Sequence, residues 1–201
     1  MALVVISGGV RSGKSSAAQR AAEHRLADGG RVIVAVFGDA DGDPEMEARI
    51  ERHRLDRPPG FETIEPADSR SWMESLPTQC VLVLDCVGTM LGRVMQECWS
   101  PSESDGFAEA AELPDGYAER VEAASADVVA ALLTLTCDRI VVTNEVGLGV
   151  VPAHATGRLF RDVLGRANRI LVEHADVASL VVAGRVLDLT DLPREIAWPH
   201  D

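Results

Sequence analysis

The sequence lacks any run of apolar residues long enough to cross a membrane. A spanning helix takes about 20 consecutive apolar residues, and no stretch of the 201 residues approaches that length. The chain also does not open with the basic and then apolar segments of a secretory leader. Its 46% hydrophobic and 25% charged residues are typical of a globular protein. We therefore expect a cytoplasmic protein, without a membrane span, folded as a single domain over residues 1–201.

Basic residues and metal-type cysteine motifs are also scarce. The formal net charge is −13 and the chain has no basic cluster, which argues against nucleic acid as a partner. No C-x-x-C spacing occurs among the four cysteines, and three of them lie in or beside apolar runs. We expect reduced thiols rather than a metal site or a disulfide at these four positions: Cys80, Cys86, Cys98 and Cys137.

Lysine is nearly absent, and the one lysine stands in a motif. The chain has 18 arginines, and Lys14 is its only lysine. It belongs to G-G-V-R-S-G-K-S, which has the Walker A pattern G-x-x-x-x-G-K-[ST]. In this motif backbone N–H groups surround a phosphate, the lysine reaches the β- and γ-phosphates, and the last hydroxyl ligates Mg²⁺. The predicted nucleotide-binding residues are Gly8, Gly9, Val10, Arg11, Ser12, Gly13, Lys14 and Ser15.

The flanking segments have the order of elements that this motif requires. An apolar run at residues 3–6 predicts a buried strand, and the residues after the motif predict a helix. Further apolar runs at 32–37, 81–84 and 139–143 alternate with predicted helices at 117–136 and 158–175, and two runs at 179–183 and 186–189 are typical of a closing hairpin. We expect an α/β P-loop NTPase fold of the RecA-like type, a three-layer sandwich around a mostly parallel sheet.

Asp85 ends the apolar run Val81-Leu82-Val83-Leu84. A carboxylate at the carboxyl end of a strand is the Walker B arrangement, in which the aspartate holds Mg²⁺ directly or through water. Apolar runs that end in aspartate are common, so the prediction depends on the Walker A motif earlier in the chain. Ser15 and Asp85 are the predicted metal ligands.

His53 lies near the end of a second predicted helix, which begins at Asp43-Pro44-Glu45 and runs to about Arg54. Met46, Ile50 and His53 share one face of this helix. From this pattern alone, a packed or hydrogen-bonded histidine is favoured over a catalytic one.

Four motifs together resemble the bifunctional adenosylcobinamide kinase/adenosylcobinamide-phosphate guanylyltransferases of cobalamin biosynthesis. The first is the Walker A motif at 8–15. The second is E-M-x-x-R-I-x-x-H at 45–53, followed by Arg57-Pro58 and by Thr63-x-Glu65. The third is V-T-N-E-V-G-x-G-x-V-P at 142–152, and the fourth is Phe160-Arg161-Asp162 with Gly165 and Asn168.

This resemblance implies a role for His53 that the helix pattern does not. In the family, the histidine of the second motif attacks the α-phosphate of GTP, forms a GMP–histidine intermediate and passes GMP to adenosylcobinamide phosphate. The same proteins phosphorylate adenosylcobinamide from a nucleoside triphosphate, ATP or GTP. The resemblance implies that Arg54, Arg57 and Glu65 line the nucleotide, that Asp85 holds Mg²⁺ or orients the acceptor, and that the chain forms a homo-oligomer, with a trimer favoured.

Two alternative functions stay open at this stage. The chain could be a small-molecule kinase of single activity, in which His53 is structural. It could also be a nucleotide-binding switch protein without transfer chemistry. Neither alternative changes the predicted roles of Lys14 and Ser15 in nucleotide binding.

Overall fold

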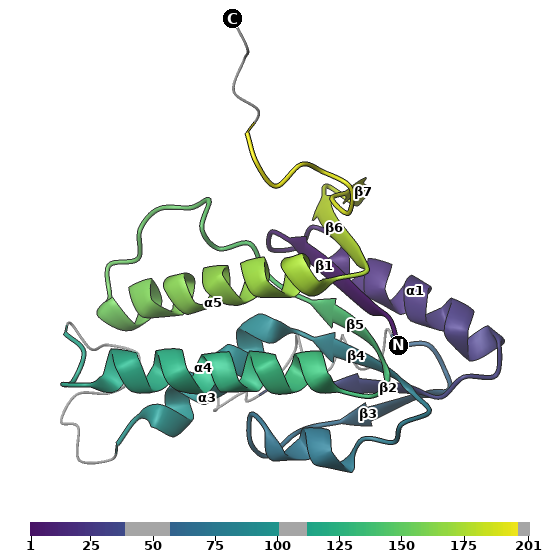
Figure 1. Ribbon diagram of the computed structural model, residues 1–201, viewed down its shortest axis with the longest axis horizontal. Helices are drawn as coiled ribbons and strands as arrows, with labels where there is room; N and C mark the ends of the chain where they lie inside the picture. The colour runs from purple at the N-terminus through teal and green to yellow at the C-terminus, as the bar shows by residue number, and fades with distance from the viewer. Residues whose placement is uncertain (39–56, 101–111, 197–201) are drawn as a thin grey trace, which may run out of the picture.

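The computed structural model describes residues 1–38, 57–100 and 112–196. Its centre is a seven-stranded sheet with the strand order β3-β2-β4-β5-β1-β6-β7 (Figure 1). Every neighbouring pair is parallel except β6 and β7, which form an antiparallel hairpin at one edge. The strands are β1 Leu3–Gly8, β2 Val32–Ala35, β3 Phe61–Ile64, β4 Val81–Asp85, β5 Asp138–Val142, β6 Val177–Val182 and β7 Arg185–Asp188.

Helices cover both faces of the sheet. Helix α1 (Lys14–Ala27) lies on one face, and α3 (Val87–Cys98), α4 (Tyr117–Thr134) and α5 (Ala155–His174) lie on the other (Figure 1). Strand β4 shows why its sequence is continuously apolar. Val81 and Val83 belong to the core cluster that includes residues of α1, while Leu82 and Leu84 belong to the cluster under α3, α4 and α5. A parallel strand buried on both faces has no position for a polar side chain.

This architecture confirms the predicted α/β fold with a mostly parallel sheet. The runs predicted as strands form β1, β2, β4 and β5, and the predicted closing hairpin is β6–β7. Strand β5 lies between β1, which carries the Walker A motif, and β4, which carries Asp85. The predicted helix from residue 43 to 54 lies outside the described residues. None of the described helices is both long and apolar enough to cross a membrane.

Helix α3 was not among the predicted elements, although its sequence carries a helical stripe. Its buried positions recur at the spacing of one helix face and include Met90, Leu91, Val94 and Met95. Its amino-terminal end is capped locally, since the Thr89 hydroxyl oxygen accepts a hydrogen bond from the Cys86 backbone N–H over 3.2 Å. The helix therefore starts directly after Asp85, at the edge of the sheet where the strands β1, β4 and β5 end.

Candidate nucleotide-binding site

The candidate site lies where three parallel strands end side by side. The register pairs Asp85 at the end of β4 with Val142 of β5. Beyond that pair the backbone continues the ladder, because Thr143 N–H donates to the Ile6 carbonyl over 2.9 Å and Glu145 N–H donates to the Gly8 carbonyl over 3.1 Å. The carboxyl edge of a parallel sheet is the usual ligand site of α/β proteins. The sheet therefore brings the segment after β5 beside the Walker A loop.

Lys14 folds back over this loop. Its ammonium Nζ donates to the Gly9 carbonyl over 2.9 Å, and the residue is only 8% exposed. Inside the loop, Ser12 N–H donates to the same carbonyl over 3.3 Å. A buried ammonium is costly unless hydrogen-bonded, so this position selects a lysine that can reach both the loop carbonyl and a bound anion.

Two glycines of the loop have distinct structural reasons. Gly13 is the N-cap of α1 and has φ 99°, in the left-handed region where a side chain is strained. At Gly8 a Cβ atom would stand 2.5 Å from the Val181 carbonyl oxygen and 2.7 Å from the Ser12 hydroxyl, so no side chain fits. The β6–β7 hairpin also supports the loop from outside, because Gly184 N–H donates to the Ser12 carbonyl over 2.8 Å.

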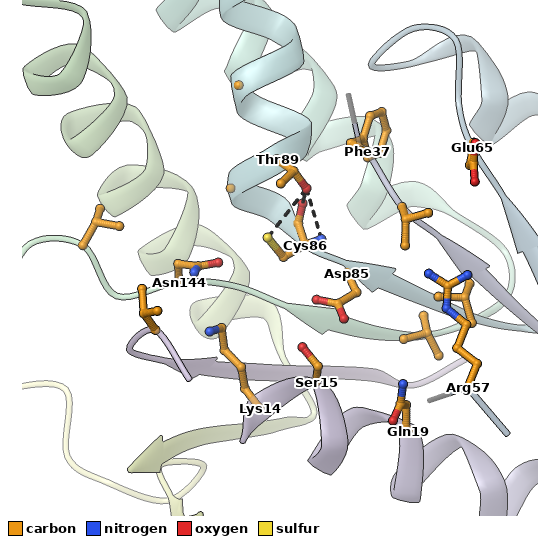
Figure 2. A pocket seen from close by; sticks show the side chains of 18 of the residues that line it. Lys14, Ser15, Gln19, Phe37, Arg57, Glu65, Asp85, Cys86, Thr89 and Asn144 are labelled. Carbon is orange, nitrogen blue, oxygen red and sulfur yellow. Dashed lines mark hydrogen bonds between the residues drawn. The ribbon is translucent and has the colours of Figure 1, made fainter. Parts of the chain in front are cut away.

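The loop opens into a cavity of about 440 Å³, within the range of small-ligand sites. Figure 2 shows Lys14, Ser15 and Asp85 directed into the same space. The structure thus brings together six of the predicted site residues from four parts of the chain. Those that line the cavity are Val10, Lys14, Ser15, Arg57, Glu65 and Asp85. Two more predicted site residues, His53 and Arg54, lie outside the described residues.

Ser15 and Asp85 form a donor set that fits Mg²⁺. The Ser15 hydroxyl points toward the Asp85 carboxylate across the cavity (Figure 2). Among the described residues, no group of three or more His, Cys, Asp or Glu side chains could hold a metal ion. Mg²⁺ at phosphate sites usually takes one or two protein ligands and completes its shell with phosphate oxygens and water. A site with one hydroxyl and one carboxylate is therefore adequate when a nucleotide is bound.

Arg57 and Glu65 enter the cavity from the side of β3, away from Lys14. The Arg57 guanidinium donates to the Thr63 hydroxyl over 2.5 Å, which fixes its position next to the sheet edge. Glu65 is exposed and follows the end of β3. In Figure 2 both residues lie on the opposite side of Ser15 from Lys14, together with Gln19 of α1. The cavity thus has a cation at each end.

Asn144 lines the cavity, yet it was not predicted as a site residue. It follows β5 and lies between Lys14 and Cys86 in Figure 2. Its side-chain oxygen Oδ1 is buried and has no hydrogen-bond partner among the described residues. A buried polar atom without a partner is rare in folded proteins and points to a ligand or to water. The signal was present in the sequence, since Asn144 is the polar residue that follows a central strand.

Cys86 also lines the cavity, but its chemistry argues against a nucleophilic role. Burial raises the pKa of its thiol, and the neighbouring Asp85 carboxylate raises it further. The reactive form of cysteine is the thiolate. The Cys86 side chain therefore stays a neutral thiol at neutral pH and serves as the N-cap residue of α3. All four cysteines are free thiols, as predicted, with Cys80 and Cys137 buried and Cys86 and Cys98 half-buried.

Comparison with solved structures returns P-loop ATPases at low sequence identity. A KaiC-like protein of Pyrococcus horikoshii OT3 is 12% identical, with a TM-score of 0.43 over 89% of this chain and 70% of that chain. A second solved structure, an isolated ATPase domain, is 11% identical, with a TM-score of 0.45 over 89% of this chain and 68% of that chain.

Comparison of sequences gives closer relatives. The chain is 33% identical to the bifunctional adenosylcobalamin biosynthesis protein CobU of Escherichia coli over 90% of this chain and 96% of that protein. It is 32% identical to CobU of Salmonella typhimurium with the same coverage. It is also 32% identical to the bifunctional protein CobP of Pseudomonas aeruginosa, over 94% of this chain and 98% of that protein. The model of one protein family matches residues 4–189. The chain belongs to that family, the cobinamide kinase / cobinamide phosphate guanyltransferases.

Proposed function

We propose that this chain phosphorylates adenosylcobinamide and then transfers GMP from GTP to adenosylcobinamide phosphate, using the cavity at the Walker A loop for both nucleotide substrates. Family membership gives the two activities. The observation that carries the assignment of the site is the convergence of Lys14, Ser15 and Asp85 on one cavity at the ends of adjacent strands. These are the groups that phosphoryl transfer needs for positioning and for neutralising charge.

In the kinase step, the hydroxyl oxygen of adenosylcobinamide attacks the γ-phosphorus of ATP or GTP. The bond from that phosphorus to the β,γ-bridging oxygen breaks, a nucleoside diphosphate leaves, and the hydroxyl proton is released. Lys14 holds the β- and γ-phosphate oxygens through its ammonium, and the amides of the loop cradle the phosphates. Ser15 and Asp85 hold Mg²⁺, which neutralises the charge that develops on the transferred group.

In the guanylyltransfer step, a ring nitrogen of His53 attacks the α-phosphorus of GTP and pyrophosphate leaves. The resulting GMP–histidine has a reactive P–N bond. A phosphate oxygen of adenosylcobinamide phosphate then attacks the same phosphorus, the P–N bond breaks, and adenosylcobinamide-GDP is released. His53 must be neutral to attack, and an imidazole with an ordinary pKa is largely neutral at pH 7.

Arg54, Arg57 and Glu65 complete the proposed nucleotide site. Arg57 is the cation at the end of the cavity opposite Lys14, so it suits phosphate oxygens that Lys14 does not reach. Glu65 beside it can accept hydrogen bonds from ribose hydroxyls or from a guanine base. Because the net charge of the chain is −13, these local cations must outweigh a repulsive overall field.

The proposal extends to the state of the protein. We propose that residues 1–201 form one nucleotide-binding domain, that the chain acts in the cytoplasm, and that it assembles as a homo-oligomer, with a trimer favoured by the family resemblance.

One labelling experiment tests the function. The protein is incubated with Mg²⁺ and GTP labelled at the α-phosphate, denatured, and examined for bound label that is labile to acid and stable to alkali. Wild type should carry such label and should lose it to adenosylcobinamide phosphate. His53→Ala should carry none, while it still phosphorylates adenosylcobinamide.

His24→Ala is the matched control, because His24 is an exposed residue of α1 outside the cavity. It should label as wild type does. Labelled His53→Ala, or unlabelled wild type, would overturn the guanylyltransferase assignment. Kinase activity in a wild type that never takes up label would leave the single-activity kinase.

A further inference from the structure

The loop that joins β5 to α5 exposes an unusual number of apolar side chains. Residues 146–153, here called the apolar loop, have the sequence V-G-L-G-V-V-P-A and contain no polar side chain. Leu148 is 90% exposed, Val150 96% and Val151 62%. Single exposed apolar residues are ordinary, but a contiguous group indicates a contact surface.

The backbone of the apolar loop is held in place by two arginines of α5. Arg161 donates from Nη2 to the Gly147 carbonyl over 3.0 Å. Arg158 donates from Nη1 to the Ala153 carbonyl over 2.6 Å and to the Pro152 carbonyl over 3.2 Å. Both anchors take carbonyl groups of the loop and leave its side chains outside. The valine and leucine side chains are therefore presented to solvent by a fixed backbone.

A close approach at the start of α5 fixes the end of the loop as well. A Cβ atom at Gly157 would stand 2.9 Å from the Pro152 Cβ, so proline and helix pack without room for a side chain. Neither Gly147 nor Gly149 has any atom within 4 Å of an ideal Cβ position. The space around the exposed part of the loop is open among the described residues, and a ligand could approach the side chains there.

The apolar loop begins at the nucleotide cavity. Glu145 N–H bonds to the Gly8 carbonyl, so the loop leaves the sheet beside the Walker A motif. Val146 lines the cavity together with Val10 and Phe160, and Val10 is itself largely exposed. The apolar surface therefore continues from the cavity wall outward onto the loop, which runs along α5 in Figure 1.

We infer that the apolar loop is the docking surface for the corrin macrocycle of the acceptor. The inference rests on the proposed function, because the acceptor is cobinamide only if the chain has the activities of its family. The acceptor must place its terminal hydroxyl or phosphate at the nucleotide phosphates, deep in a cavity of about 440 Å³ that also receives the nucleotide. The macrocycle is larger than a nucleotide, so it stays outside, next to the cavity mouth.

The chemistry of the macrocycle matches this surface. Corrin has two broad faces of ring carbons and methyl groups, with amide side chains at its edge. Leu148, Val150 and Val151 offer a surface without hydrogen-bonding side chains, which suits such a face and gains from its removal from water. Binding energy from a remote part of a substrate is also a way to position the reacting group.

The test compares the double variant Leu148→Ser/Val150→Ser with wild type. Equilibrium dialysis with cobinamide, without nucleotide, measures docking independently of either reaction. We expect the dissociation constant to rise about tenfold or more, because two contacts with apolar carbon are lost. With adenosylcobinamide phosphate the KM should rise by a similar factor, while formation of labelled GMP–enzyme from GTP should proceed at the wild-type rate.

Two further variants and one further substrate sharpen the test. Val186→Ser/Leu187→Ser makes the same chemical change on the exposed strand β7 and should leave cobinamide binding unchanged. Leu148→Met/Val150→Ile keeps the surface apolar and should bind as wild type. Phosphorylation of free 1-amino-2-propanol, the reacting arm without the macrocycle, should be slow and equal in wild type and in the serine variant.

Unchanged cobinamide binding in the serine variant would overturn the inference. So would a serine variant that changes the oligomeric state in sedimentation analysis and keeps its affinity for cobinamide, since the loop would then be an interface between copies of this chain. A wild type that binds cobinamide but never takes up GMP label would contradict the guanylyltransferase function and leave the docking result standing.

Discussion

The hydroxyl of Thr143 donates a hydrogen bond to the side-chain oxygen of Asn168, and both residues are buried. The amide nitrogen of the same Asn168 side chain donates to the Asn144 carbonyl over 2.9 Å and to the Glu145 carboxylate over 3.3 Å. One asparagine of α5 thus fixes three consecutive residues beyond β5. This segment lies between the Walker A loop and Asp85, so its position shapes the cavity wall.

Replacing Asn168 should destabilise the fold. Asn168→Ala would leave the buried Thr143 hydroxyl and the Asn144 carbonyl without their partner, at a cost of about 1–3 kcal/mol for buried groups left unsatisfied. Urea unfolding followed by circular dichroism measures the change. Arg169→Ala, at the exposed neighbouring position, is the control and should stay within about 0.5 kcal/mol of wild type. An equal loss in both variants would show that the network contributes little.

Asn144 should matter to the nucleotide rather than to the fold. Asn144→Asp places a carboxylate beside Lys14 in the cavity, where it would repel triphosphate oxygens. We expect GTP affinity to fall about tenfold or more, which corresponds to roughly 1.4 kcal/mol. Isothermal titration calorimetry gives the affinity, and thermal unfolding serves as the control for folding. Full GTP affinity in Asn144→Asp would place this side chain outside the nucleotide contacts.

Lys14 should not be replaceable by arginine. Its ammonium is a compact charge that bonds to the Gly9 carbonyl inside a tight loop, whereas a guanidinium is a planar fork. Lys14→Arg should lower both activities about a hundredfold or more, the usual effect of losing one positioned charge donor. Arg20→Lys makes the reverse change at an exposed position of the same helix and should keep wild-type rates. Normal kinase turnover in Lys14→Arg would contradict a shared phosphate site.

Asp85 should determine the response to Mg²⁺. Asp85→Asn keeps the shape of the side chain and removes the charge that suits a hard cation. The Mg²⁺ concentration for half-maximal activity should rise, whereas binding of GTP in the presence of a chelator should not weaken. Asp188→Asn, on the exposed strand β7, is the matched control. An unaltered Mg²⁺ profile would instead support a role for Asp85 in orienting the acceptor.

Asp138 predicts a pH dependence of stability. A hydrogen bond from the Ala2 backbone N–H over 2.8 Å and the ion pair with Arg25 hold the pKa of Asp138 below its usual range. A lowered carboxyl pKa stabilises the fold above the pKa of the unfolded chain, and this contribution is lost as pH falls through the folded pKa. Arg25 is more than half exposed, so solvent limits the effect to about 1 kcal/mol or less.

Asp138→Asn should therefore be less stable than wild type at pH 7, and the gap should close below the ordinary pKa of aspartate, about 3.9. Urea unfolding across this range measures the gap. A difference that stays constant with pH would show that the carboxylate charge is not involved.

Short-range patterns predicted a large share of the fold and of the site. Walker A residues are consecutive, and their glycines and lysine are required by the geometry of a single loop, so the motif is legible without tertiary information. Strands buried on both faces are continuously apolar, which made β1, β2, β4 and β5 legible too. Helix α3 was missed although its apolar residues recur at helical spacing, because Gly88 and Gly92 lower its helix propensity.

By itself, the sequence determined that this chain binds a nucleoside triphosphate at residues 8–15 and belongs with the cobinamide kinases and guanylyltransferases; the role of His53 stays a prediction. Only the tertiary structure decided that β5 separates the two phosphate-binding strands, that Asn144 stands between Lys14 and Cys86, and that α5 holds an apolar loop at the cavity mouth. The physical reason is the range of the interactions. Loop geometry and strand burial act on neighbouring residues, whereas strand order and the anchoring of a loop depend on residues far apart in the chain.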